Sequence, residues 1–101
     1  MNSKIKDENI DFLFRAILSL ESMEECYNFF EDLCTVPELK AMAQRIQVAK
    51  LLKSHTVYSE IVNQTGASTA TISRVNRSLN YGCDGYTAAF ERLNVITKKD
   101  K

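Results

Sequence analysis

The fold is decided by residues 58–77, which read YSEIVNQTGASTATISRVNR. A helix-turn-helix needs a small residue that can adopt positive φ at its corner, and apolar residues where the second helix packs across the first. Gly66 supplies the corner, although Thr65 beside it is less apolar than such a turn favours. The apolar residues are Ile61, Val62 and Ala67 around the turn and Ile72, Val75 and Leu79 on the second helix. The last three recur at i, i+3 and i+7, so we expect two short packed helices.

The opposite face of that second helix carries hydroxyl, methyl and guanidinium groups and no carboxylate. Its residues are Thr69, Ala70, Thr71, Ser73, Arg74 and Arg77, with Thr71 at the edge. Thr and Ser can pair with either kind of atom on a base edge, and Ala can contact a thymine methyl group. Arginines and the N–H groups at a helix start attract phosphate. The six residues are therefore candidate DNA contacts, and the alternative is a Ser/Thr-rich surface helix with two solvated arginines.

The rest of the chain also has helical spacing, so the predicted fold class is all-α. Apolar stripes are formed by Ile10, Leu13, Phe14 and Ile17, by Met23, Cys26, Tyr27, Phe30 and Cys34, and by Met42, Ile46, Ala49 and Leu52. Two capping boxes, Ser22 with Glu25 and Thr35 with Glu38, predict the starts of the second and third helices. The third helix should end near Ser54 and His55, and a last short helix is expected over about residues 85–95.

Length and composition indicate one ordinary globular domain over residues 1–101. The chain is 45% hydrophobic and 26% charged, which argues against disorder along its length. No apolar run exceeds three residues, so we expect no membrane span and no signal peptide, and a cytoplasmic location. The three cysteines are odd in number and lack CxxC spacing, which indicates reduced thiols and no cysteine-based zinc site.

The zero net charge hides an uneven distribution along the chain. Residues 1–39 hold nine acidic and three basic residues, whereas residues 40–82 hold six basic residues and a single acid, Glu60. This asymmetry favours binding of a polyanion by one face of the protein, while the other face meets solvent or a partner. By itself it is weak evidence, because a solvated basic face is common.

Three segments together resemble the Trp repressor superfamily, and within it the YerC/YecD-type TrpR-related proteins. They are GASTATISRVNRSLNYG at 66–82, FFEDLCTVPEL at 29–39 and AQRIQVAKLL at 43–52, and the likeness runs from about Phe12 to Leu93. The resemblance implies a six-helix subunit in an intertwined homodimer. Acidic dimerisation helices would span about residues 8–53 and a reading head about 57–80, with two such heads placed on successive turns of operator DNA.

The resemblance also implies where a small-molecule effector would bind. Arg45 and Arg74 match the two arginines of the Trp repressor's co-repressor site, Thr35 matches its threonine and Ser78 its serine. Val75 stands where that site has a glycine, and an isopropyl group there would fill the slot for the indole. We therefore expect no tryptophan binding of the usual kind, while another effector stays open. Val75 also lies on the apolar stripe that packs the two helices together, and we favour this structural interpretation. The two arginines could serve an ion pair and a phosphate contact without any small ligand.

Two hypotheses for function follow. The first is a dimeric, sequence-specific DNA-binding regulator, most plausibly a repressor that occupies an operator; the crowding of aromatic residues at Phe12, Phe14, Tyr27, Phe29 and Phe30 supports association. The second is a helical scaffold that binds another protein through the acidic helices without binding DNA. We expect no enzyme, cofactor or metal, because the single histidine, His55, sits at a helix end and no phosphate-cradling glycine loop is present.

Overall fold

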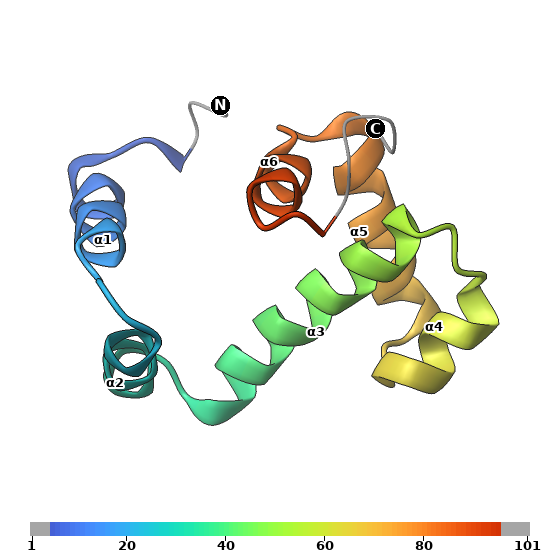
Figure 1. The fold of residues 1–101 in the computed structure, drawn as a ribbon, viewed down its shortest axis with the longest axis horizontal. Coiled ribbons are helices and arrows are strands. Elements are labelled where there is room, and N and C mark those ends of the chain that lie inside the picture. Colours follow the sequence, from blue (N-terminus) through green and yellow to red (C-terminus); the bar gives the residue numbers. More distant parts are fainter. Residues whose placement is uncertain (1–4, 96–101) are drawn as a thin grey trace. The chain divides into compact units, whose positions relative to one another are not determined.

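The computed structural model describes residues 5–95, and within this range the chain is helical with no strand. The six helices are α1 (Glu8–Leu18), α2 (Met23–Leu33), α3 (Val36–Lys53), α4 (Tyr58–Thr65), α5 (Thr69–Tyr81) and α6 (Gly85–Arg92) (Figure 1). The all-α, six-helix prediction is confirmed. None of the helices in this range is long and apolar enough to cross a membrane.

The starts of α1, α2 and α3 are fixed by side chains close to them in sequence. Asp7 accepts a hydrogen bond from the Ile10 N–H at 2.7 Å. Ser22 accepts from the Glu25 N–H at 3.1 Å, and the Glu25 carboxylate in turn accepts from the Glu21 N–H. The corresponding bonds between Thr35 and Glu38 begin α3. The predicted capping box of Thr35 with Glu38 is therefore present. At α2 the Ser22 cap is present, but the Glu25 carboxylate accepts from Glu21, one residue before the cap, and not from Ser22.

Left-handed backbone conformations mark the ends of two helices near their predicted positions. His55, with φ of 60°, lies just beyond α3, where the Thr56 N–H donates to the Leu51 carbonyl at 3.0 Å. The third helix thus ends where predicted. The last helix ends at Arg92, earlier than the predicted residue 95, and the chain turns there through Asn94, whose φ is 59°.

The chain divides into two compact units, residues 1–39 and residues 40–101. The division falls where the sequence changes from acidic to basic. The second unit holds the core, which is made of Val48, Ala49, Ile61, Ala67, Ile72, Val75 and Phe90. These residues come from α3, α4, the turn, α5 and α6, so the two helices around Gly66 are packed on a common apolar centre.

The predicted inward stripe of α3 is only half right. Ala49 is buried and Leu52 packs against the core, but Met42 and Ile46 are 39% and 44% exposed. Val48, which lies outside the predicted stripe, is fully buried. The reason is that apolar residues lie on more than one face of α3. Which of these faces is buried depends on where α4, α5 and α6 pack against the helix.

The first unit buries much less of its apolar surface. Neither α1 nor α2 contains a fully buried residue, although each is strongly amphipathic. Phe29 and Phe30 contact each other edge to face, whereas Phe12 and Tyr27 are about two-thirds exposed. The carboxylates of α2, Glu24, Glu25, Glu31 and Asp32, are exposed. Cys26 and Cys34 are half-buried free thiols and Cys83 is an exposed one.

Candidate nucleic-acid interface

The turn between α4 and α5 is built from Gly66 and from the hydroxyl of Thr65. Gly66 has φ of 72°, and its N–H donates to the Val62 carbonyl at 2.8 Å. The Thr65 hydroxyl donates to the Ile61 carbonyl at 2.7 Å and accepts from the Ala67 N–H at 3.1 Å. Thr65, which seemed too polar for this position, therefore supplies the acceptor that a buried N–H requires.

A side chain of α3 supports the same turn. The Gln44 amide donates to the Thr65 carbonyl at 3.1 Å across 21 residues of sequence. This bond joins α3 to the corner that orients α5. Sequence reasoning missed Gln44, because a glutamine on a helix has no distinguishing signal until its distant partner is known.

Ser68 caps the start of α5. Its hydroxyl accepts from the Thr71 N–H at 3.1 Å and donates to the Thr71 hydroxyl at 3.0 Å, while its carbonyl accepts from the Ile72 N–H. Thr71 is half-buried and belongs to this cap. The N–H groups of Thr69 and Ala70 lie ahead of these bonds, at the positive end of the helix dipole, which is the end that attracts phosphate.

The outward face of α5 is open. Thr69, Ala70 and Ser73 are exposed, and so are Arg74 and Arg77. On the opposite side Ile72 and Val75 lie in the core and Leu79 packs against it. The predicted contact residues are thus brought to one surface, with Thr71 at its edge.

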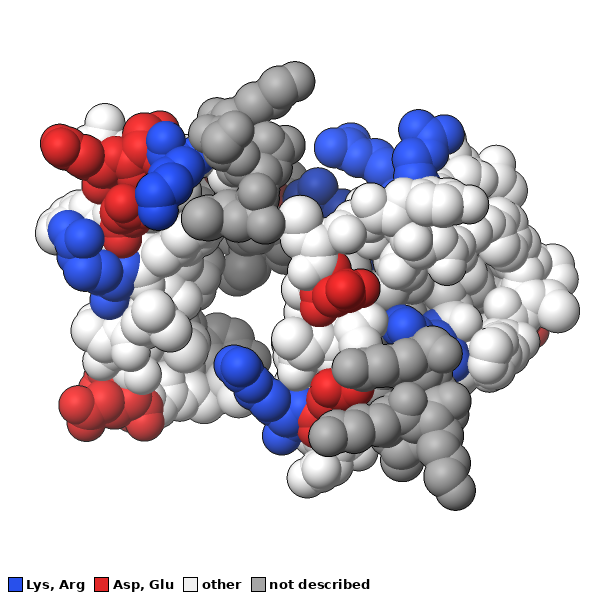
Figure 2. Space-filling view, turned by 90° about the horizontal axis from the view of Figure 1, so that it is seen from above, with Lys and Arg blue, Asp and Glu red and all other residues white. Residues whose placement is uncertain are grey.

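The charge on this part of the chain suits an anionic partner. The helix α5 contains two arginines and no acidic residue. In the view of Figure 2, several Lys and Arg side chains stand out on the right-hand part of the molecule, and a few acidic groups are visible there as well. The acid-free outer face of α5 itself can approach a polyanion without placing its own carboxylates against phosphates.

The five residues expected around an effector lie in different settings. Val75 is 3% exposed and forms part of the core, which fits its packing role. Arg45 is half-buried, and Arg74 and Ser78 are exposed. Thr35 belongs to the first unit, where its hydroxyl donates to the Glu38 carboxylate at 2.8 Å.

Of these five residues, Ser78 lines a hollow of about 460 Å³ in the second unit. The other residues around this hollow are Ile46, Gly82, Cys83, Gly85, Tyr86 and Ala89. Its described lining is mostly apolar and contains neither Arg45 nor Arg74, so among residues 5–95 no cation is placed there to hold a carboxylate.

Comparison with known proteins places these features in a family. The family model described as Trp repressor protein matches residues 8–94. The chain is 52% identical over 90 residues to the uncharacterised protein YerC of Bacillus subtilis, covering 89% of this chain and 86% of that protein.

Solved structures agree with the sequence comparison. A TrpR-like protein from Eubacterium eligens is 56% identical, with a TM-score of 0.91 over 96% of this chain and 100% of its own. A candidate Trp repressor from Staphylococcus aureus is 53% identical, with a TM-score of 0.89 over 94% and 95% of the two chains. The chain therefore belongs to the Trp repressor family.

Proposed function

We propose that the protein is a sequence-specific DNA-binding transcriptional regulator that acts as a homodimer and represses by occupying an operator. The observation that carries the proposal is the exposed, acid-free outer face of α5, which a glycine turn presents on a packed core. Membership of the Trp repressor family supports it.

In this proposal the start of α5 enters the major groove. Thr69, Ala70 and Ser73 contact base edges, because small side chains allow close approach and hydroxyls can donate or accept. Arg74, Arg77 and the N–H groups at the start of the helix bind phosphates, which positions the reading head without selecting sequence. Thr71 completes the contact surface at its edge.

The first unit supplies the dimer interface in this proposal. Its helices leave large apolar side chains exposed, and Met23, Cys26, Tyr27, Phe30 and Leu39 line an apolar hollow of about 140 Å³. A second copy covering this surface would bury it. Two-fold symmetry would then place two reading heads about 34–36 Å apart, one turn of DNA, as a palindromic site requires.

Repression by tryptophan binding of the usual kind is not part of the proposal. Val75, which the resemblance aligns with the glycine of the Trp repressor's co-repressor site, is part of the core, so its side chain would fill the space for an indole. An effector of another chemistry is compatible with Arg45, Arg74 and Ser78, which are at least partly exposed.

The experiment that tests the function is selection of bound duplexes from a random pool by the purified full-length protein, followed by mobility shift at low salt. We expect retention of random duplex and tighter retention of a selected site with two-fold symmetry. Failure to retain either duplex would refute DNA binding and favour a protein-interaction scaffold built on the exposed apolar helices.

A further inference from the structure

The exposed side chains at the start of α5, ahead of Arg74, are all short. Thr69, Ala70 and Ser73 are exposed there, and none of the three carries a guanidinium, amide or carboxylate group. Paired hydrogen bonds to a base edge are made by such groups: arginine pairs with guanine in this way, and asparagine or glutamine pairs with adenine. The start of α5 therefore cannot read guanine or adenine by paired hydrogen bonds.

Four other polar side chains of α5 and its cap bond to each other along the helix. The Ser68 hydroxyl donates to the Thr71 hydroxyl at 3.0 Å and accepts from the Thr71 N–H at 3.1 Å. The two asparagines of α5 lie in its second half, where the Asn80 amide donates to the Asn76 side-chain oxygen at 3.4 Å. These bonds favour side chains turned along the helix over side chains extended toward a base.

Thr69 and Ala70 each present a methyl group. Thymine is the one standard base that carries a methyl group in the major groove, and contact between two methyl groups removes both from water. The hydroxyls of Thr69 and Ser73 distinguish bases poorly, because a hydroxyl can pair with a donor or with an acceptor. Of the contacts that these three residues can make, methyl contact is therefore the one that selects a base.

We infer, on the basis of the proposed DNA-binding function, that the start of α5 selects thymine by contact between the thymine 5-methyl group and the methyl groups of Thr69 and Ala70. Arg74 and Arg77 lie further along the helix and would bind phosphate, because base edges are reached by the first residues of a recognition helix. Loss of one methyl contact should weaken binding about fourfold, as expected from the transfer free energy of one buried methylene group.

Base analogues in the operator test which chemical group is read. The full-length protein is titrated with the duplex enriched from the random pool, in which one thymine of one half-site at a time is replaced by uracil, which lacks only the methyl group. We expect at least one position where uracil weakens binding about fourfold. At the same position 5-methylcytosine should bind about fourfold more tightly than cytosine. Uracil outside the two half-sites is the control and should leave the affinity unchanged.

Three results would overturn thymine selection while leaving DNA binding in place. The first is an enriched site in which no thymine is sensitive to uracil. The second is a larger loss of affinity with 7-deazaguanine, which lacks the N7 acceptor of guanine, than with uracil. The third is retention of random duplex without any enriched site. Retention of no duplex at all would instead refute the DNA-binding function itself, and thymine selection with it.

Two variants of Thr69 test the protein side of the contact. Thr69→Ser removes the methyl group and keeps the hydroxyl, so it should reduce the fourfold penalty for uracil at a sensitive thymine. Thr69→Val keeps a methyl group and removes the hydroxyl, so it should retain that penalty whatever its overall affinity. Because Thr69 is exposed, both variants should fold.

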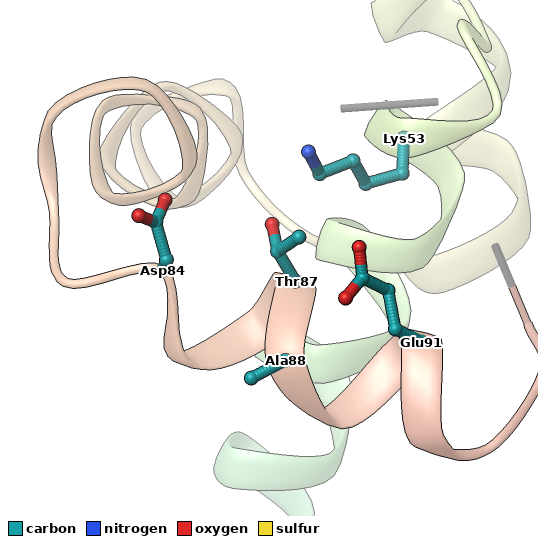
Figure 3. Close-up of a pocket in the computed structure, with 5 residues that line it drawn as sticks. All are labelled: Lys53, Asp84, Thr87, Ala88 and Glu91. Atoms are coloured by element: carbon teal, nitrogen blue, oxygen red, sulfur yellow. The ribbon is translucent and has the colours of Figure 1, made fainter. Parts of the chain in front are cut away.

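Ala70→Gly removes the second methyl group and should likewise reduce the penalty for uracil. Its control is Ala88→Gly, which removes the methyl group of an exposed alanine from a different helix and should leave every penalty unchanged. Figure 3 shows Ala88 on α6, in the lining of a hollow of about 210 Å³ that contains none of the proposed DNA contacts; the other lining residues are Lys53, Asp84, Thr87 and Glu91. Penalties for uracil that persist in full in both Thr69→Ser and Ala70→Gly would overturn the inference.

Discussion

At the scale of single residues, the left-handed backbone of Gly66 would be unfavourable for a residue with a side chain, and this energy cost can be measured separately from any steric clash. A Cβ added to Gly66 would meet nothing within 4 Å, so only its φ of 72° opposes a side chain. Left-handed backbone costs a non-glycine residue about 1–2 kcal/mol. We predict that Gly66→Ala lowers the free energy of unfolding by about this amount in urea denaturation.

Gly85 provides the control for Gly66. A Cβ there also meets open space, but Gly85 begins α6 and its φ is not positive. Gly85→Ala should leave the free energy of unfolding unchanged or raise it by less than about 1 kcal/mol. If Gly66→Ala and Gly85→Ala lose the same free energy of unfolding, the left-handed backbone of Gly66 is not the cause of the loss.

Thr65 contributes to the same turn through its hydroxyl. Thr65→Val would remove the acceptor for the Ala67 N–H, and Ala67 is buried. Leaving such a group unpaired costs about 1–3 kcal/mol, so thermal or urea unfolding should show a loss of that size. Thr65→Ser keeps the hydroxyl and should recover most of the loss. If the valine variant is as stable as the parent protein, the bond contributes nothing.

Arg77 and Thr69 should affect DNA binding in different ways. Arg77→Ala removes a proposed phosphate contact, so affinity should fall on all sequences and the slope of log affinity against log salt should flatten by about one. Thr69→Ala should instead change the preference among sites, by about 1–3 kcal/mol at the affected base pair.

The control for these two variants is Arg92→Ala, which removes an exposed arginine at the end of α6. It should leave both affinity and salt dependence unchanged in fluorescence titrations. Equal loss on every sequence for the Arg77 and Thr69 variants would contradict their separate roles.

At the scale of helices, the capping box of α3 should make its start sensitive to pH. The backbone N–H of Thr35 and then its hydroxyl donate to Glu38, which lowers the pKa of that carboxyl. Because the folded pKa is below the unfolded value, the stabilisation is complete above the unfolded value and is lost as pH falls through the folded one. An NMR titration should therefore give a pKa for Glu38 below its ordinary range.

Replacing Thr35, the hydrogen-bond partner of Glu38, tests what lowers the pKa of the Glu38 carboxyl. Thr35→Val removes the hydroxyl bond and keeps the backbone N–H, so the pKa of Glu38 should rise part of the way back. Ser22→Ala, which removes the N-cap of α2, should leave the pKa of Glu38 unchanged. A Glu38 pKa that is identical in the parent and the Thr35 variant would exclude the hydroxyl as a cause.

The helices also show which structural features a sequence can specify. The caps of α2 and α3 and the Gly66 corner were predictable, because each depends on residues at most four positions apart. The buried face of α3 was not, since Val48 rather than Ile46 is covered only after three other helices pack. The exposed face of α5 followed from its stripe, whereas the hydrogen bond from Gln44 to the Thr65 carbonyl joins residues 21 positions apart and left no pattern to find.

At the scale of the whole molecule, association and DNA binding should be linked. Two reading heads on one symmetric site bind with a higher effective concentration than separate subunits can reach. A substitution that separates the subunits should therefore weaken DNA binding even though it leaves α5 unchanged. The exposed apolar surface of the first unit, remote in sequence from the reading head, allows this to be tested.

If the protein forms the proposed dimer, Tyr27→Glu, which places a charge on the apolar hollow of α2, should convert it to a monomer and lower DNA affinity at least about tenfold. Sedimentation velocity measures the first effect and mobility shift the second. Asn28→Glu introduces the same charge at an exposed neighbour outside that hollow, and it should remain dimeric with unchanged affinity.

A monomeric parent protein, or a Tyr27 variant that stays dimeric, would mean that the first unit does not form the interface. A monomeric Tyr27 variant with full affinity would show that one reading head is sufficient, because paired contact would then contribute nothing to binding.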